Sequence, residues 1–274
     1  MARVSRRRAD VRRRGPAAVI RRSAVRPVDY DTVAPAYDRR YEYRRYEGVE
    51  AAVRGFVAAP RPARAILEAG CGTGHWLATV ADLVPRRVGV DFSAAMLAAA
   101  CTNAPGALRV RARAERVPLV DASVDRVLCV NALHHFADRA GFAAEARRVL
   151  RPGGGVLVVG LDPHVETGRW WVYETFPNAR RLDCERYPSA AAIRDLLGGA
   201  GFAVGPTTVA QEIRAAVPFA EAAARGYLDR RSTSQLMVID DTEYESGLER
   251  LRAAQPVLHA DIRLYATAGW VGEP

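Results

Sequence analysis

Residues 68–74, Glu-Ala-Gly-Cys-Gly-Thr-Gly, have the composition of a loop that binds a small ligand through its backbone. Glycines at alternate positions permit a tight turn and let a ligand approach without meeting Cβ atoms. The loop follows an apolar run and precedes an expected helix, so its free N–H groups suit a carboxylate. Its G-x-G-x-G spacing differs from the G-x-G-x-x-G of dinucleotide-binding proteins, which makes a nicotinamide or flavin enzyme the weaker interpretation.

An acidic residue, Asp91, ends the next apolar run, 17 positions after Gly74. A carboxylate at such a strand end can accept hydrogen bonds from both hydroxyls of a ribose. The other interpretation is an aspartate that caps the helix expected after Ser93. Together with the glycine loop, Asp91 predicts a site for a ligand that contains adenosine.

Alternating strands and helices are expected to position these side chains. Strands are expected at 65–69, 87–91, 107–110, 125–130 and 156–159, with helices at 76–83, 93–100 and 141–150. This alternation indicates a parallel sheet with helices on both faces. Beyond Leu161 we expect a helix at 189–200, a strand at 202–209, a helical stretch at 211–255 and a last strand at 259–267.

The formal net charge of +9 is concentrated at the N-terminus. Residues 1–27 hold ten arginines and one acid, whereas the rest of the chain has 30 basic and 30 acidic side chains. We interpret residues 1–28 as a disordered arginine-rich tail. The alternatives are an arm for nucleic acid or another anionic surface, and a twin-arginine export signal, for which the apolar run at 17–20 is too short.

Composition narrows the class of protein further. No run approaches 18 apolar residues, so no membrane span is expected. The four cysteines form no C-x-x-C pair, and Cys71 and Cys129 lie in expected core segments. We therefore expect no metal site, no disulfide framework and a reducing cytoplasm.

Five segments follow one another almost continuously from residue 30 to residue 159: YDTVAPAYD (30–38), ILEAGCGTG (66–74), VGVDFSAAML (88–97), AERVPLVDASVDRVLCVNALHHF (114–136) and EARRVLRPGGGVLVV (145–159). In this order and spacing the chain resembles the class I S-adenosylmethionine-dependent methyltransferases of the small-molecule type, which include the ubiquinone and menaquinone methyltransferases. The resemblance implies an α/β, Rossmann-like, doubly wound and mostly parallel seven-stranded sheet. Its last strand is antiparallel, with N-terminal helices and a helical insertion before that strand.

The resemblance also implies S-adenosylmethionine as the cofactor and assigns residues to it. The loop would hold the methionine part, Asp91 the ribose, and Phe92 and Met96 the adenine. In the family, an acidic-Ala-Glu/Asp triplet after the third strand often binds the adenine amine. Here Arg113 replaces its first acid, so Ala114 and Glu115 are the two residues that match. Tyr30 and Tyr37 would close over the site. The expected cofactor residues are Tyr30, Tyr37, Glu68, Gly70, Cys71, Gly72, Gly74, Asp91, Phe92, Met96, Ala114, Glu115 and Asn131.

Methyl transfer from a sulfonium is an in-line displacement, so rate comes mainly from positioning and from excluding water. A general base is needed only when the acceptor must lose a proton. His134 and His135 are the candidates for such a base, against a packing or orienting role. Cys71 needs only to be small, and we expect no nucleophilic role for it.

Aromatic residues gather after Leu161, where ligands of doubly wound sheets bind. Trp170, Trp171, Tyr173 and Phe176 could line a pocket for a planar or apolar acceptor, or could cover the sheet edge or a subunit contact. The stretch 211–255 is interpreted as a lid or an oligomer surface.

Residues 29–274 are thus expected to form one methyltransferase domain, with an N-terminal helical cap (29–59), a cofactor-binding core (60–161) and a substrate-side part that completes the sheet (162–274). The expected reaction is methyl transfer to an O, N or C atom of a small molecule in secondary or quinone-type metabolism. A homo-oligomer is left open. A nucleic-acid methyltransferase is the alternative that the tail suggests, but strand four ends in VNALHHF, no Pro-Cys nucleophile is present and the body is neutral. A cyclase or a non-catalytic cofactor-binding protein would carry the same cofactor motifs.

Overall fold

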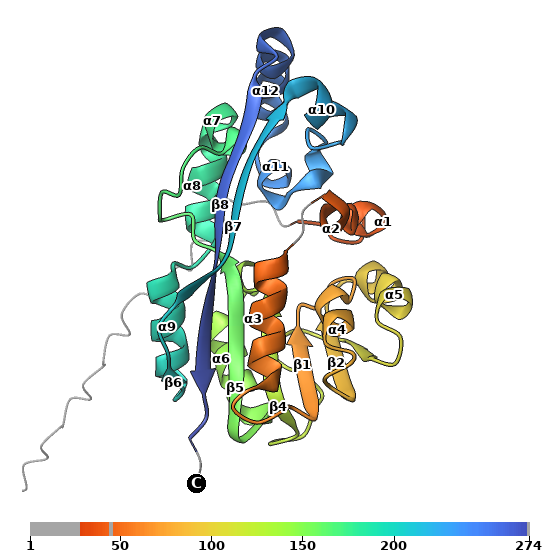
Figure 1. Ribbon diagram of the computed structural model, residues 1–274, viewed down its shortest axis with the longest axis vertical. Coiled ribbons are helices and arrows are strands. Elements are labelled where there is room, and N and C mark those ends of the chain that lie inside the picture. The colour runs from red at the N-terminus through yellow and green to blue at the C-terminus, as the bar shows by residue number, and fades with distance from the viewer. Residues whose placement is uncertain (1–27, 44–45, 273–274) are drawn as a thin grey trace, which may run out of the picture.

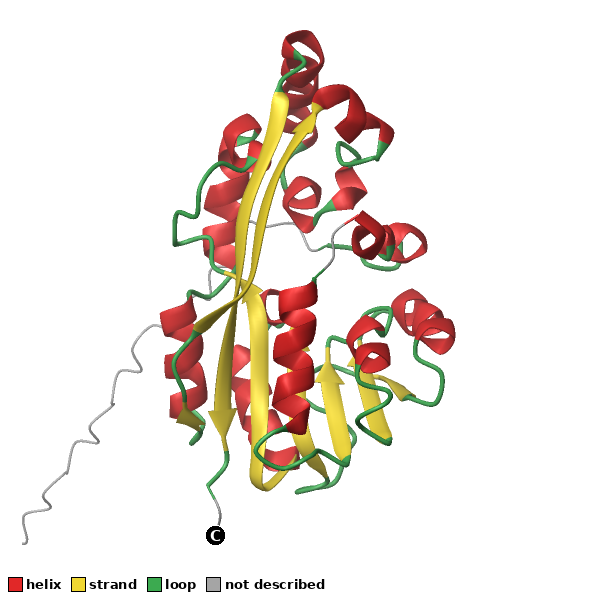
Figure 2. Cartoon of the chain, viewed as in Figure 1, coloured by secondary structure: helices red, strands yellow, loops and turns green. Residues whose placement is uncertain are grey.

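The computed structural model describes residues 28–43 and 46–272, so the interpretation of residues 1–27 lies outside the described residues. The chain forms one twisted sheet with helices on both faces (Figure 2). The strands are β1 (Ala65–Ala69), β2 (Arg86–Asp91), β3 (Leu108–Arg111), β4 (Val124–Val130), β5 (Leu150–Leu161), β6 (Ala203–Val204), β7 (Thr208–Pro218) and β8 (Val257–Trp270).

The helices divide into an N-terminal group, a group beside the main sheet and a group near the N-terminal end of β8 (Figure 1). The first group is α1 (Ala34–Tyr37), α2 (Arg39–Tyr43) and α3 (Glu47–Ala58). The second is α4 (His75–Thr79), α5 (Ala94–Asn103), α6 (Arg139–Val149) and α9 (Ala190–Gly199). The third is α7 (Trp171–Thr175), α8 (Pro177–Arg186), α10 (Phe219–Ala224), α11 (Ser234–Val238) and α12 (Asp241–Ala254).

The sheet has the order β3-β2-β1-β4-β5-β8-β6, and β7 also pairs with β8. The first five strands are parallel, whereas β8 is antiparallel to β5, β6 and β7. The mostly parallel sheet with an antiparallel last strand is therefore confirmed. Because consecutive strands run the same way, the residues that follow β1, β2 and β4 meet at one edge of the sheet.

Two apolar layers hold this sheet between its helices. One face of β1, β4 and β5 packs against α3 and α4, through side chains such as Val53, Ile66 and Leu77. The other face packs against α6 and α9, through side chains such as Val127, Phe142 and Leu197. Strand β1 is buried along its whole length, as expected for a central parallel strand covered on both faces.

The segment 211–255 differs from the helical insertion that its sequence predicts. It begins inside β7, which pairs with β8 from Thr208 opposite Ala266 to Pro218 opposite Val257, so the sheet has eight strands rather than seven. Glu, Gln, Arg and Ala favour a helix in isolation, but pairing with β8 overrides that propensity. Helices α10, α11 and α12 then follow as expected.

Strands β7 and β8 continue beyond the end of β5 as a two-stranded ribbon (Figure 1). We call residues 170–186 and 208–263 the ribbon lobe, because helices α7, α8, α10, α11 and α12 surround the ribbon there. Its buried side chains, including Phe176, Leu236 and Leu258, are continuous with the core under α3. In the described residues no helix combines the length and apolar composition needed to cross a membrane.

Candidate active site

A cavity of about 700 Å³ lies at the sheet edge where β1, β2 and β4 end. This volume is in the range of pockets that hold a drug-sized ligand. Its walls come from the segment before α1, the glycine loop, the end of β2, the turn after β3 and the turn after β4. Ten of the expected cofactor residues line it, namely Tyr30, Tyr37, Gly70, Gly72, Asp91, Phe92, Met96, Ala114, Glu115 and Asn131.

The glycine loop needs its glycines because two of them stand where a side chain would collide. Gly70 has φ +71°, and a Cβ there would lie 2.5 Å from the Cβ of Ala132. Gly74 has φ +82°, and a Cβ there would lie 3.1 Å from the Cβ atoms of Ala100 and Ala104. The Gly70 and Cys71 N–H groups donate to the Val90 carbonyl at 2.8 and 3.0 Å, which ties the loop to β2.

Glu68 is wholly buried at the foot of this loop, and its carboxyl oxygens have no well-formed hydrogen bond among the described residues. The Leu77 backbone N–H is a donor too weak to offset the burial. Burial, with the Asp91 carboxylate nearby, raises its pKa well above the usual value. An unpartnered buried carboxyl group is costly unless a ligand supplies a donor or a positive charge. S-adenosylmethionine carries a sulfonium and an ammonium group, so this residue fits that cofactor.

Asp91 connects the loop to the start of α5. Its Oδ2 accepts the Gly72 N–H at 2.8 Å and its Oδ1 accepts the Ser93 N–H at 2.9 Å. Burial raises its pKa despite these hydrogen bonds. The helix-capping role falls to Ser93, whose Oγ accepts the Met96 N–H at 3.1 Å. The Asp91 carboxylate therefore lines the cavity without serving as the cap.

The far end of the cavity is bordered by Phe92, Met96, Ala114 and Glu115. Met96 is 1% exposed, whereas Phe92 is 62% exposed and has the Arg113 guanidinium 5.2 Å from its ring centroid. Glu115 Oε1 accepts the backbone N–H groups of Ala137 and Asp138 at 3.0 and 3.2 Å. Glu115 thus orders the loop before α6 as well as lining the cavity.

His134 and His135 follow β4 in a short 3-10 turn. The His135 Nε2 and the Tyr30 hydroxyl oxygen are 2.6 Å apart, and the His134 ring stacks on Tyr187 with 3.8 Å between centroids. Burial is the main cause that lowers both imidazole pKa values, to about 3 for His135 and well below the usual value for His134. Both rings are therefore neutral at pH 7 and able to accept a proton.

The segment that carries Tyr30 and Tyr37 is fastened over the cavity by two aspartates. Asp38 accepts the Thr73 hydroxyl at 2.5 Å and the Asn103 amide at 2.6 Å. Asp31 accepts the Ser93 hydroxyl at 2.5 Å. The N-terminal segment therefore forms one wall of the cavity and is joined to both the glycine loop and α5.

A second, narrower cavity of about 90 Å³ adjoins the first. The two share Tyr30, Tyr37, Asn131 and His134 in their walls. Its other walls come from α2, the residue before α3, the end of β5, and the ribbon lobe with the residues next to it. They are Arg40, Tyr46, Leu161, Trp170, Tyr187, Ile213, Thr233, Ser234, Gln235, Ile262 and Leu264. A molecule placed there would lie between the ribbon lobe and the first cavity.

The four aromatic residues expected to form an acceptor pocket occupy different places. Trp170 lines the second cavity, and Trp171 lines an outer depression that also includes Tyr227. Tyr173 donates its hydroxyl to Asp183 Oδ2 at 2.7 Å, inside the ribbon lobe. Phe176 is wholly buried against Gly247 and Tyr244, and it lines none of the cavities found in the described residues.

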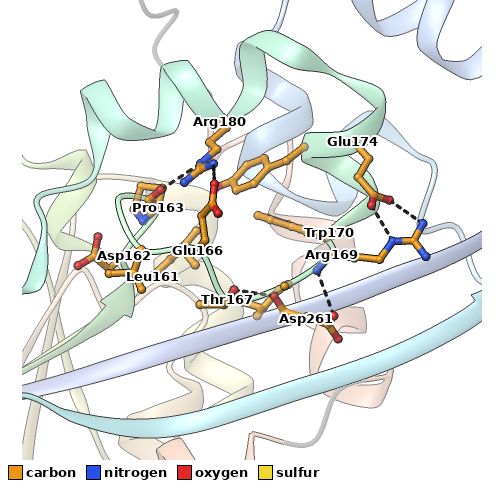
Figure 3. Close-up of a pocket in the computed structure, with 14 residues that line it drawn as sticks. Leu161, Asp162, Pro163, Glu166, Thr167, Arg169, Trp170, Glu174, Arg180 and Asp261 are labelled. Carbon is orange, nitrogen blue, oxygen red and sulfur yellow. Dashed lines mark hydrogen bonds and ion pairs between the residues drawn. The ribbon is translucent and has the colours of Figure 1, made fainter.

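On another side of Trp170 lies a polar cavity of about 450 Å³, shown in Figure 3. Four of its charged side chains form two ion pairs, Arg180 with Glu166 and Arg169 with Glu174, each at 2.8 Å. The Asp162 and Asp261 carboxylates accept backbone N–H groups instead. The Thr167 hydroxyl donates to the Asp261 carbonyl at 2.8 Å, which fastens the loop to β8. These contacts hold the loop before α7 in place.

Several cavity residues were missed by sequence reasoning. Arg40, Gln235 and Ile213 lie in segments with no recognisable motif, and they reach the second cavity only because β7 and β8 bring the ribbon lobe over the sheet edge. Tyr187 belongs to the aromatic segment, which was the one available signal. Of the expected residues, Glu68, Cys71 and Gly74 lie beside the first cavity without lining it. In the described residues no group of three or more His, Cys, Asp or Glu side chains could hold a metal ion.

Residues 67–158 match the family described as "Methyltransferase domain". A protein of Mycolicibacterium smegmatis, named "Probable S-adenosylmethionine-dependent methyltransferase", is 33% identical over 64% of this chain and 65% of its own length. A ubiquinone/menaquinone biosynthesis C-methyltransferase of Acidiphilium cryptum is 36% identical over 49% of this chain and 57% of its own length. The chain thus spans between about half and two thirds of the length of these two relatives.

Among solved structures, the [4+2]-cyclase SpnF superposes with a TM-score of 0.57 at 17% identity, over 92% of this chain and all of that one. At this identity the likeness shows the fold alone. The matched family and these two relatives are thus all named for methyl transfer, and the Mycolicibacterium smegmatis protein is also named for dependence on S-adenosylmethionine.

Proposed function

We propose, from the premise that residues 67–158 form a methyltransferase domain of the class I S-adenosylmethionine-dependent type, that this protein transfers a methyl group to an O, N or C atom of a small molecule. The observation that carries the proposal is the 700 Å³ cavity, because it joins the glycine loop, Asp91, Glu115 and Asn131 from the ends of four successive strands. Secondary or quinone-type metabolism is the proposed setting.

The proposed cofactor residues are those expected from the sequence, in the same roles. Glu68 and the glycine loop would face the charged methionine part, and Asp91 the ribose. Phe92, Met96, Ala114 and Glu115 would face the adenine, and Asn131 the reacting side. Bound S-adenosylmethionine supplies an activated methyl group, so the chain's own contribution is to orient the acceptor and keep water away. Tyr30 and Tyr37 serve that exclusion, since they cover the junction of the two cavities.

A base, where the acceptor needs one, is proposed among the two histidines. His134 lines both cavities, whereas His135 lines only the first and is joined to Tyr30. Geometry therefore favours His134 as the proton acceptor and His135 as a residue that positions Tyr30. The lowered pKa values support a neutral imidazole for either role.

We also propose the division of residues 29–274 into a cap (29–59), a cofactor core (60–161) and a substrate-side part (162–274). In the substrate-side part, Trp170 would contact the acceptor, Trp171 the entrance, and Tyr173 and Phe176 would support them from within the lobe. A reducing cytoplasm is proposed because the four cysteines carry free thiols.

Two measurements test the proposal. S-adenosylmethionine should bind with one molecule per chain in titration calorimetry, and a small-molecule extract incubated with methyl-labelled cofactor should yield a labelled product. Cofactor binding without any labelled product would support the alternative of a cyclase or a non-catalytic protein. The [4+2]-cyclase SpnF has the same fold, so the fold is compatible with that alternative. Label found in added nucleic acid instead would support the nucleic-acid alternative.

A further inference from the structure

Arg40 places a guanidinium group in the wall of the second cavity. Its Cζ lies 3.7 Å from the Tyr37 ring centroid, and its Nε donates to the Tyr37 carbonyl at 3.1 Å. The titratable groups that interact with this guanidinium are tyrosine hydroxyls, those of Tyr37, Tyr41, Tyr46 and Tyr30. Among the side chains described, no carboxylate forms an ion pair with Arg40.

Three arginines that line the adjoining cavities have acidic partners. Arg186 lies 3.6 Å from Asp183, Arg225 lies 2.6 Å from Glu221, and Arg231 lies 2.9 Å from Asp229. A charged group held in a partly buried position without a partner is costly, since the protein interior screens it less than water does. Arg40 thus differs from these three arginines, and its lack of an acidic partner in the second cavity points to a partner from outside the chain.

Trp170 provides a second donor without a partner. Its side chain is 7% exposed, it lines the same cavity, and its indole N–H has no acceptor in the described residues. The walls between the two donors are partly apolar, with Leu161, Ile213 and Leu264 among them. A buried donor that lacks an acceptor calls for an explanation, and a bound ligand with oxygen atoms is one.

We propose that the acceptor of the methyl group carries an anionic oxygen group, a carboxylate or a phosphate, which Arg40 binds in the second cavity while the aromatic and apolar walls hold the remainder. The inference rests on the proposed methyl transfer and names the acceptor class for the same site. A guanidinium suits either anion, because its planar N–H groups match a pair of oxygens. The narrowness of the cavity favours a small anionic molecule over a polymer.

The test uses three small probes titrated by calorimetry into the full chain, with and without saturating S-adenosylhomocysteine. Benzoate represents a carboxylate, phenyl phosphate represents a phosphate, and benzyl alcohol is the neutral analogue. At least one anion should bind about tenfold more tightly than benzyl alcohol, since hydrogen bonds to charged groups are the stronger ones. The tighter of the two anions identifies the group.

Arg40→Gln should weaken binding of the preferred anion by about tenfold or more and leave benzyl alcohol unaffected. Arg40→Lys keeps the charge and should weaken the anion less. The matched control is Arg181→Gln, which removes the same charge from the exposed face of α8. Trp170→Phe keeps an aromatic ring and removes the N–H, so it should weaken binding of the anion several-fold. This variant tests the inference if Arg40→Gln fails to fold.

Equal binding of benzoate, phenyl phosphate and benzyl alcohol would overturn the inference, as would no binding of either anion. Anion binding that is unchanged in both Arg40→Gln and Trp170→Phe would overturn it too. The affinity for S-adenosylhomocysteine should stay within about twofold in every variant, because Arg40 lies outside the first cavity. Failure of the unaltered protein to bind S-adenosylhomocysteine would instead count against the proposed function. In that case the anion titrations without S-adenosylhomocysteine still test the role of Arg40.

Discussion

The cofactor core and the ribbon lobe build their functional surfaces in opposite ways. In the core, residues 60–161, the proposed contacts Asp91, Glu115 and Asn131 lie at strand ends or within a few residues of them. A short stretch of sequence there carries both the strand and its functional residue. By contrast, the walls of the second cavity come partly from the ribbon lobe and partly from residues outside it, as distant in the chain as Arg40, Tyr187, Gln235 and Leu264. The first arrangement is local in the chain, and the second exists only after folding.

This difference shows where variation is tolerated. The core meets one fixed ligand, and its geometry depends on glycines that no other residue can replace without strain. The ribbon lobe is the part proposed to contact the acceptor, and its wall residues lie outside the parallel strands of the core. One sheet can thus hold a constant cofactor beside a variable acceptor cavity.

The largest effect is expected in the core of the ribbon lobe. Phe176→Ala should lower the free energy of unfolding by about 3–5 kcal/mol, because the ring is wholly buried between α7 and α12. Urea unfolding followed by circular dichroism measures it. Phe92→Ala, at a side chain that is 62% exposed, is the matched control and should cost less than about 0.5 kcal/mol. Equal losses in the two variants would mean that the lobe is not packed as described.

The next effect belongs to the cofactor core. Asp91→Ala should weaken S-adenosylmethionine binding about a hundredfold, because the proposed ribose contacts and the hydrogen bonds to Gly72 and Ser93 are lost together. Titration calorimetry measures the change. Asp82→Ala removes an exposed carboxylate paired with Arg54 and should leave the affinity unaltered. An Asp91→Ala affinity equal to that of the unaltered protein would remove Asp91 from the cofactor site.

A smaller effect is expected from pH at the junction of the two regions. The pKa of His135 is about 3 in the folded protein because of burial and nearby arginines, against about 6.5 when unfolded. Between these values the unfolded state binds the additional proton, so stability rises with pH by at most about 1.4 kcal/mol per unit from this group. The contribution is complete above pH 6.5 and is lost as pH falls toward 3.

His135→Gln should therefore flatten the dependence of the unfolding free energy on pH between about 5 and 6.5. Urea unfolding at closely spaced pH values measures the slope. Tyr30→Phe removes the hydroxyl that meets His135 Nε2, and it should leave most of the slope because burial is the larger cause. A slope that His135→Gln does not change would show that the imidazole is accessible to water.

The smallest effect concerns Glu68. Burial raises its pKa, so the folded protein holds it neutral while the unfolded chain ionises it, and its contribution to stability falls as pH rises above about 4.5. Glu68→Gln should raise the free energy of unfolding at pH 8 by about 1 kcal/mol and weaken S-adenosylmethionine binding. Greater stability with unchanged cofactor affinity would separate Glu68 from the cofactor.

Much of the core could be predicted because its signals are local. The apolar run Ala65–Ala69 predicts a strand, the glycines after it predict a turn, and Asp91 marks the end of the next strand. The helix after the loop ends sooner than expected, at Thr79 rather than at residue 83, since helix ends depend on tertiary contacts. Residues 211–217 mislead because their helix-forming composition gives way to pairing with a strand about 50 residues later.

The sequence by itself determined the class of fold, the parallel direction of the core strands and the glycine loop on which the proposed cofactor rests, because these follow from residues adjacent in the chain. Only the tertiary structure decided that β7 and β8 extend into a ribbon, that Phe176 lies inside the lobe, and that Arg40 faces Trp170 across a cavity. The physical reason is that strand pairing and burial join segments far apart, and such contacts leave no pattern of short period in the sequence.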